Sequence, residues 1–265
     1  MIECVVNISE GRDHDLLAEL DDAAGDALLD RHSDPDHHRS VFTLVGEDAP
    51  RSLAALAVER LHLDRHRGAH PRIGVVDVVP FVPLGHGTQS DALRARDAYA
   101  SWSASSLGVP CFLYGPERTL PEVRRGAFHS LAPDHGTLRP HPTAGATAVG
   151  QRDVMVAYNV ELADPDLELA REVARAVRST AVRALGLSVG DRVQVSMNLI
   201  APHEVGPDRA FDAVAALAPI ARAELVGLMP AVVLDAVPAH RWSALDLAED
   251  RTIEARLEAR GWTPA

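Results

Sequence analysis

An apolar run at residues 73–82, IGVVDVVPFV, constrains the fold more than any other part of the chain. The run is too short and too marked by proline for a helix, so it predicts a strand that is buried on at least one face. Four ionisable residues precede it, namely His66, Arg67, His70 and Arg72. Ionisable groups at the end of a buried strand are a frequent place for chemistry, and we take His70 as the candidate proton-transfer group.

Strand and helix patterns alternate along the whole chain, which predicts α/β layering rather than an all-β sandwich. Strands are expected at residues 3–8, 40–45, 75–82, 111–114, 154–162, 192–200 and 224–229. Helices are expected at residues 14–28, 50–61, 90–106, 120–125, 165–185 and 210–223, with a surface helix or tail from residue 237. A loop rich in turn formers at 133–150 separates halves of similar rhythm, so we expect units over residues 1–150 and 151–265.

The charge of the chain excludes several classes of partner. It has 26 basic and 38 acidic residues, a formal net charge of −12 and no basic block, so neither nucleic acid nor an anionic membrane is an expected partner. All the basic residues are arginine. The absence of lysine excludes a lysine Schiff base and a phosphate-loop lysine.

The cysteine content and the apolar spans of the sequence indicate the compartment. Cys4 and Cys111 are too few for a disulfide framework or a cysteine-type zinc site, and both lie in apolar segments. The first residues lack a basic region followed by an apolar stretch, and no span approaches the ~20 apolar residues of a membrane helix. We therefore expect a cytoplasmic protein with buried free thiols and no membrane association.

Three histidines spaced by four residues, His62, His66 and His70, raise the alternative of a metal site on one helix. However, His70 precedes Pro71, and residues before proline avoid the helical region. Gly68 weakens the helix further. We therefore expect no metal.

Two further polar clusters stand at the ends of expected strands. Asp36, His38 and Arg39 precede the second strand, and the planar fork of Arg39 suits a carboxylate, although a solvated turn is the alternative. Asn7 and Glu10 follow the first strand and precede a helix. Ligands bind at such carboxyl ends in open α/β sheets, although polar residues there could simply cap the helix.

Taken together, the motifs suggest a family. The chain resembles glutamate formiminotransferase, and the formiminotransferase part of formiminotransferase-cyclodeaminase, over most of its length and in the same order. The resemblance rests on four segments: ECVVNISEG (3–11), DHHRSVFTLVG (36–46), GAHPRIG (68–74) with DVVPF (77–81), and HPTAGAT (141–147). The histidine segment is the most specific of them.

The resemblance implies a fold and an activity. The fold is two tandem ferredoxin-like α/β (α+β) subdomains, with mixed or antiparallel sheets and helices on their faces, in a homodimer. The activity is transfer of the formimino group from N-formimino-L-glutamate to N5 of tetrahydrofolate, in histidine degradation and one-carbon metabolism. The family's general acid and base matches His70. The implied substrate-binding residues are Asn7, Glu10, Asp36, His38, Arg39, Arg72 and Asp77.

Tetrahydrofolate, as the acceptor substrate, is the expected cofactor. The family's folate-contacting loop matches residues 136–145. The implied folate-binding residues are Asp134, Gly136, Thr137, His141, Thr143, Gly145 and Thr147. The chain departs from the family pattern at Val6, where proline is usual, and at His135, where an aromatic residue is common. A second folate-contacting loop is shortened to about residues 179–190.

Two alternatives remain. A related transferase or hydrolase could use the same histidine on another amidine or formyl donor, and the shortened second loop favours it. A non-catalytic folate- or metabolite-binding protein would bind its ligand with no rate that depends on His70.

Overall fold

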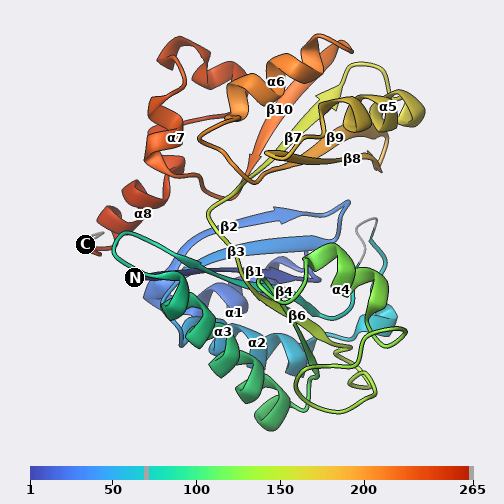
Figure 1. Cartoon of the computed structure of the whole chain (residues 1–265), viewed down its shortest axis with the longest axis vertical. Helices are drawn as coiled ribbons and strands as arrows, with labels where there is room; N and C mark the ends of the chain where they lie inside the picture. The colour runs from blue at the N-terminus through green and yellow to red at the C-terminus, as the bar shows by residue number, and fades with distance from the viewer. Residues whose placement is uncertain (69–71, 263–265) are drawn as a thin grey trace. The chain divides into compact units, whose positions relative to one another are not determined.

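The computed structural model describes residues 1–68 and 72–262, and the chain divides into two compact units, Met1–Arg152 and Asp153 onward. Each unit has its own sheet (Figure 1). Among the described residues, no helix is long and apolar enough to cross a membrane.

The first unit is built on a six-stranded mixed sheet in the order β2-β3-β1-β4-β6-β5. Its strands are β1 (Ile2–Ile8), β2 (Leu28–Asp34), β3 (Arg39–Val45), β4 (Val76–Pro83), β5 (Cys111–Tyr114) and β6 (Thr147–Gln151). The strands from β2 to β4 are antiparallel, whereas β6 pairs in parallel with both β4 and β5.

Helices cover both faces of this sheet (Figure 1). One face carries α1 (His14–Ala24), α2 (Ala49–Arg60) and α3 (Gln89–Trp102), and the other carries α4 (Leu120–Gly126). Short 3₁₀ or π turns lie at Gly25–Ala27, Leu63–Arg65 and Ser103–Leu107. The succession β1-α1-β2-β3-α2-β4 with strand order 2-3-1-4 is that of a ferredoxin-like unit, extended at the β4 edge by β6 and β5.

The core of the first unit lies between the sheet and its three-helix face. Val6 and Ile8 of β1 are fully buried in one cluster with Leu17 of α1 and Leu53 of α2. Each such side chain stabilises the fold by about 1.5–3 kcal/mol relative to exposure. Because successive side chains of a strand point to opposite faces, Asn7 points away from this cluster. The polar positions of β1, β3 and β4 therefore share the opposite face.

The second unit has a four-stranded antiparallel sheet in the order β10-β7-β9-β8. Its strands are β7 (Val156–Leu162), β8 (Val182–Val189), β9 (Arg192–Leu199) and β10 (Ile220–Val226). Its helices are α5 (Leu167–Val177), α6 (Pro207–Ala215), α7 (Ala231–Asp235) and α8 (Ile253–Ala259), with 3₁₀ turns at Ala239–Leu245 and Glu249–Arg251. The succession β7-α5-β8-β9-α6-β10 is again ferredoxin-like, so the predicted fold class is confirmed.

Two helices were predicted too long, and the strand that follows each of them, β2 and β8, was not predicted. The helix expected at 14–28 ends at Ala24, because Gly25 follows with a φ of 57° and closes it. The helix expected at 165–185 ends at Val177, and β8 begins at Val182. The sequence of β8 favours helix by composition, but pairing along β9 overrides that propensity.

Three further predictions were wrong. The loop expected up to residue 150 ends earlier, because β6 forms between β4 and β5 from small residues with a weak strand pattern. The helix expected at 210–223 ends at Ala215, and β10 follows. The predicted surface tail instead packs into the second core, where Leu245 is 1% and Leu247 5% exposed.

Candidate active site

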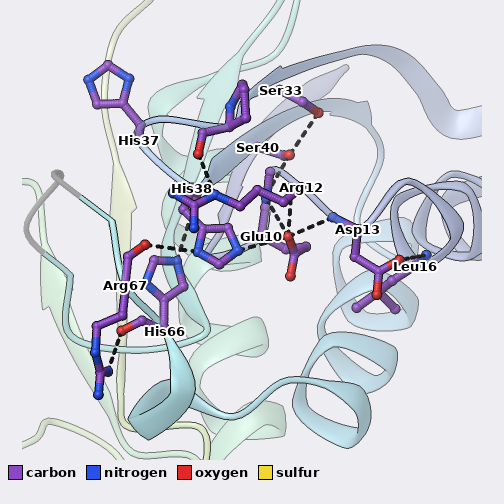
Figure 2. Close-up of polar contacts among 12 residues, drawn as sticks. Glu10, Arg12, Asp13, Leu16, Ser33, His37, His38, Ser40, His66 and Arg67 are labelled. Carbon is purple, nitrogen blue, oxygen red and sulfur yellow. Dashed lines mark hydrogen bonds and ion pairs between the residues drawn. The ribbon is translucent and has the colours of Figure 1, made fainter. Parts of the chain in front are cut away.

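Three motif side chains meet beside β1 and β3 (Figure 2). Nε2 of His38 lies 3.0 Å from Oε1 of Glu10, and Nδ1 of His38 lies 3.2 Å from the carbonyl oxygen of Arg67. The rings of His38 and His66 stack with centroids 4.1 Å apart and planes inclined by 24°. Residues that lie far apart in the sequence are thus in direct contact, as Figure 2 shows.

The turn between β2 and β3 presents His38 to this cluster. Oδ1 of Asp34 accepts the N–H groups of Asp36 and His37, each at 2.8 Å, and Oδ2 accepts Nδ1 of His37 at 2.8 Å. Burial raises the pKa of Asp34, but the hydrogen bonds from His37 and Asp36 outweigh it and hold that pKa well below its ordinary value. His38 then takes a φ of 50°, a conformation that costs a non-glycine residue energy.

Gly68 lies against the same turn. A Cβ there would stand 2.3 Å from the carbonyl oxygen of His37, closer than any real contact. Only glycine lets the backbone of this segment approach the turn so closely. The glycine of the histidine motif therefore brings that segment against the 34–38 turn.

The two stacked rings have different surroundings. Both nitrogens of His38 face oxygen atoms, those of Glu10 and of the Arg67 carbonyl. Nε2 of His66 lies 2.8 Å from the His38 carbonyl oxygen, and Nη1 of Arg72 contacts both ring nitrogens of His66, with Nδ1 at 2.8 Å. Burial, and then the positive charges of Arg72 and His38, lower the pKa of His66 to about 4, against the hydrogen bond to the carbonyl. His66 is therefore a neutral ring at neutral pH.

The carboxylate of Glu10 binds the backbone of the turn that precedes α1. Its Oε1 accepts the N–H groups of Gly11 at 2.8 Å, Arg12 at 2.7 Å and Asp13 at 3.0 Å. Burial raises the pKa of Glu10, but these three bonds and the charge of His38 outweigh it and lower that pKa. Glu10 is an ionised partner that fixes the His38 ring.

A second cluster surrounds Asp77, which is 2% exposed. Its Oδ1 accepts the N–H of Ile73 at 2.8 Å, and its Oδ2 accepts Nη2 of Arg124 at 2.6 Å and Nη1 of Arg39 at 3.4 Å. Burial raises the pKa of Asp77, but Arg124 and Arg39 outweigh it and lower that pKa. Asp77 is thus a buried anion between two guanidinium groups.

Arg39 is held from β1 as well. Oδ1 of Asn7 accepts Nε of Arg39 at 3.0 Å and Nη2 at 2.5 Å. Burial, and the nearby charges of Arg124 and Arg72, lower the pKa of Arg39 to about 10, while Asp77 opposes the shift. Arg39 therefore stays charged at neutral pH in a partly buried place, which favours an anionic ligand.

Arg124 was not predicted from the sequence. Its helix, α4, carries no motif, and its contact with Asp77 spans 47 positions in the chain. Arg124 becomes recognisable only once α4 lies on the face of the sheet that carries Asn7, Arg39 and Asp77. Arg124 lies outside the four motif segments of the sequence.

The second half of the candidate folate loop forms backbone hydrogen bonds with residues on both sides of the histidine segment. Val75 donates to the Ala144 carbonyl at 2.9 Å, and Leu63 donates to the Thr143 carbonyl at 2.8 Å. Gly145 has a φ of 74°, and a Cβ there would stand 2.3 Å from the Ile73 carbonyl oxygen. The glycine of this motif therefore lets the loop close on the residues that follow Arg72.

The other candidate folate residues make hydrogen bonds within the loop or with the sheet. Asp134 accepts the Leu113 N–H at 2.8 Å and pairs with Arg118 at 2.6 Å. Thr137 Oγ1 donates to the Arg139 carbonyl at 2.9 Å, His141 Nδ1 accepts the Ala144 N–H at 3.0 Å, and Thr147 Oγ1 donates to the Val76 carbonyl at 2.8 Å. Thr147 is 1% exposed, so its side chain belongs to the sheet.

The candidate general acid and base, His70, lies outside the described residues, and its role stays a prediction. The described residues that flank its segment, Gly68 and Arg72, both contact the 37–38 turn. In the described ranges 1–68 and 72–262, no three His, Cys, Asp or Glu side chains are grouped to hold a metal ion.

The fold and the site define a class: an α/β protein of two ferredoxin-like units, with an arginine cluster around the buried Asp77 and a stacked histidine pair on the first. Residues 1–152 match the family model described as the formiminotransferase domain, N-terminal subdomain. The chain belongs to this formiminotransferase family, so the predicted resemblance is confirmed.

Curated relatives match most of the chain. A glutamate formimidoyltransferase of Streptococcus pyogenes serotype M1 is 35% identical over 88% of this chain and 90% of its own length. A glutamate formimidoyltransferase of Thermoplasma acidophilum is 32% identical over 97% of both chains. The formimidoyltransferase-cyclodeaminase of Sus scrofa is 31% identical over 87% of this chain and 50% of its own length.

Proposed function

We propose that this protein transfers the formimino group of N-formimino-L-glutamate to N5 of tetrahydrofolate, its acceptor substrate. The names of the relatives that match nearly its whole length support this reaction. The observation that carries the proposal is the convergence of the family's motif segments around Arg72 and Ile73. Arg72 contacts the 37–38 turn, and Asp77 and the 143–146 loop bind the backbone that follows.

The reaction needs one proton carrier. N5 attacks the amidine carbon, a tetrahedral intermediate forms, and the bond from that carbon to the glutamate nitrogen breaks. A base must take the proton from N5, and an acid must give one to the leaving nitrogen. We assign both steps to His70, because an imidazole has an ordinary pKa of about 6.5 and exchanges protons in both directions at neutral pH.

The neighbouring histidines are suited to a supporting role. His66 has a pKa lowered to about 4 and uses both nitrogens in hydrogen bonds. Both nitrogens of His38 also have partners, Oε1 of Glu10 and the Arg67 carbonyl oxygen. Neither ring offers a nitrogen that can take up a proton without losing a partner, which supports His70 as the proton carrier.

Both substrates are anions, and we propose that the arginines bind their carboxylates. Arg39 and Arg72 present guanidinium groups beside β1 and β3, and planar guanidinium matches carboxylate in two parallel hydrogen bonds. Asn7 and Asp77 orient Arg39, while Glu10, His38 and Asp36 belong to the adjoining turn and helix end. We propose that all seven residues form the substrate side of the site.

We propose that residues 134–147 bind the pterin of tetrahydrofolate. The loop turns at Gly136, where φ is 92°, and at Gly145, where φ is 74°. Glycines at such points let the backbone approach a flat ring closely. The candidate contacts are Asp134, Gly136, Thr137, His141, Thr143, Gly145 and Thr147.

The test of the reaction is direct. Purified protein is mixed with N-formimino-L-glutamate and tetrahydrofolate, and the product is converted by acid into the strongly absorbing 5,10-methenyl compound. We expect product that depends on both substrates and on protein concentration, with one glutamate released per transfer. Absence of product at saturating folate would contradict the proposal.

A different donor is the second candidate, and one observation favours it. The connection from α5 to β8 is short, because α5 ends at Val177 and β8 begins at Val182. A folate tail therefore has little loop to contact there. The same assay with formyl and other amidine donors distinguishes the two, since the proposed function requires N-formimino-L-glutamate to be the best substrate.

We propose further that the protein is a cytoplasmic homodimer with residues 1–150 as the catalytic unit and 151–265 as the second unit. Cys4 and Cys111 are buried free thiols, which suits a reducing compartment, and the family resemblance supports the dimer. Light scattering after size-exclusion chromatography measures the subunit number, and a monomer at working concentration would contradict it.

A further inference from the structure

We propose that Arg124 is a positioning residue that makes this site select a donor with two carboxylates. The inference rests on the proposed transfer reaction and adds to it a residue outside every motif segment. It follows from how the buried carboxylate of Asp77 is shared between Arg124 and Arg39.

The main ion pair of Asp77 is with Arg124. Nη2 of Arg124 lies 2.6 Å from Oδ2 of Asp77, and Nη1 of Arg124 lies 3.4 Å from Oδ1. Nη1 of Arg39 lies 3.4 Å from the same Oδ2. A charge-assisted hydrogen bond is strong near 2.8 Å and weak at the longer distance. Arg124 therefore neutralises most of the charge that Asp77 would otherwise direct at Arg39.

Arg39 is oriented by a neutral group at the same time. Its Nε and Nη2 both donate to the amide oxygen of Asn7, at 3.0 and 2.5 Å. An amide holds the guanidinium plane without cancelling its charge. Arg39 is thus fixed in direction by Asn7, and Asp77 cancels little of its charge because Arg124 makes the closer ion pair with that carboxylate.

Positive charge is in excess within this group, because three guanidinium groups, those of Arg39, Arg72 and Arg124, accompany the one carboxylate of Asp77. Burial first, and then the charges of Arg124 and Arg72, lower the pKa of Arg39, and burial and Arg124 lower that of Arg72, with Asp77 opposing both shifts. The three cations therefore repel one another across a poorly hydrated space. Two carboxylates relieve this repulsion more than one does.

The donor fits the position of this cluster better than folate does. In N-formimino-L-glutamate, the α-carboxylate is close to the amidine that reacts. In tetrahydrofolate, the glutamate carboxylates are separated from N5 by the whole p-aminobenzoyl group. Arg72 follows His70 by two residues, and Asp77 binds the N–H of Ile73, so the cluster adjoins the proposed proton carrier.

The test compares Arg124→Gln with Arg125→Gln, its exposed neighbour on α4. We expect Arg124→Gln to raise KM for N-formimino-L-glutamate by about 10- to 100-fold, as loss of a charge-assisted interaction does. The kcat value and the KM for tetrahydrofolate should stay within about threefold, and Arg124→Lys should restore part of the loss. Arg125→Gln should match wild type.

Inhibitor selectivity gives a readout that a structural role would not move. Glutarate has two carboxylates and butyrate has one, and calorimetry measures the binding of each without turnover. Wild type should prefer glutarate, and Arg124→Gln should reduce that preference at least tenfold. A fall in kcat alone with the preference kept, or a rise in KM for folate instead, would overturn the inference.

Failure of the reaction and failure of the inference can be told apart. If wild type binds glutarate over butyrate but forms no product, the proposed transfer fails while the dicarboxylate site stands. If Arg124→Gln does not fold, Arg124→Lys and wild type carry the test, and equal affinity of wild type for the two inhibitors overturns the inference.

Discussion

His38 and His66 stack with their ring centroids 4.1 Å apart, and Nε2 of His66 also lies within hydrogen-bond distance of the His38 carbonyl oxygen. The His38 ring lies between two oxygen acceptors, while the His66 ring lies between the His38 carbonyl and Arg72. The pair is stable while His66 is neutral, because a proton on His66 would add a positive charge beside His38 and Arg72.

This relationship predicts a pH-dependent stability. The pKa of His66 is about 4 in the folded protein and near 6.5 in an unfolded chain, so below pH 6.5 the unfolded state binds more protons. Stability from this residue is therefore complete above about pH 6.5 and falls as the pH drops towards 4. With a discount for the partly exposed ring, we expect the free energy of unfolding of wild type relative to His66→Gln to fall by about 1 kcal/mol between pH 7 and pH 5.

Urea denaturation at several pH values measures that difference, and His129→Gln, an exposed position, is the control. A constant difference between wild type and His66→Gln across this range would show that the His66 environment is not the cause.

His70 should behave differently from His66 in catalysis. We expect His70→Asn to lower kcat by about 10²- to 10⁴-fold, the usual contribution of a positioned acid or base. Its free energy of unfolding should be close to that of wild type. Turnover within tenfold of wild type would contradict the assignment of proton transfer to His70, and His129→Gln again serves as the unaffected control.

Removal of the charge of Glu10 should loosen the histidine pair. Glu10 accepts three backbone N–H groups of the turn before α1 and contacts Nε2 of His38. Glu10→Gln keeps the shape but weakens each of these bonds, so we expect a loss of about 1–3 kcal/mol in the free energy of unfolding. Denaturation of Glu10→Gln beside Glu19→Gln, an exposed carboxylate on α1, provides the comparison.

The arginine cluster should be more sensitive to loss of its anion than to loss of a cation. Asp77→Asn leaves Arg39 and Arg124 near each other without the buried carboxylate, and we expect a loss of about 3–5 kcal/mol. The double variant with Arg124→Gln should lose less than the sum of the single variants, because the residues share one interaction. Additive losses in a double-mutant cycle would contradict this pairing.

Gly150 should tolerate a methyl group only if its neighbour is reduced. Tyr114 of β5 pairs with Gly150 of β6, and a Cβ on Gly150 would stand 2.1 Å from the tyrosine ring. We expect Gly150→Ala to cost about 1–3 kcal/mol through overpacking, and much less in a Tyr114→Val background. Thermal unfolding of the four proteins of this cycle tests the contact, and an equal cost in both backgrounds would disprove it.

The sequence predicted the elements whose pattern is local. The apolar run before Pro83 became β4, and the segments containing Val6 and Phe42 became β1 and β3. β2 and β8 were missed because each follows a helix closely and neither is fully buried, so hydropathy alone did not separate strand from helix. Their existence depends on pairing with β3 and β9.

The sequence likewise indicated some residues of the candidate site and missed others. Glu10, His38 and Arg39 stood out because polar groups next to buried strands are unusual. In the structure His38 contacts Glu10, whereas Arg39 contacts Asn7. Arg124 could not be found, because its role depends on where α4 lies rather than on its neighbours in the sequence. The sequence also does not show that Asp77 lies closer to Arg124 than to Arg39.

The place of β6 in the first sheet bears on how the protein assembles during synthesis. β6 is the last strand of its sheet to leave the ribosome, yet it lies between β4 and β5 and is the neighbour that joins β5 to the rest. Until Thr147–Gln151 is available, β4 has an open edge and β5 has no strand beside it. Residues 134–146 lead directly into this strand, so a nascent chain gains its candidate folate loop in the same step that completes the sheet.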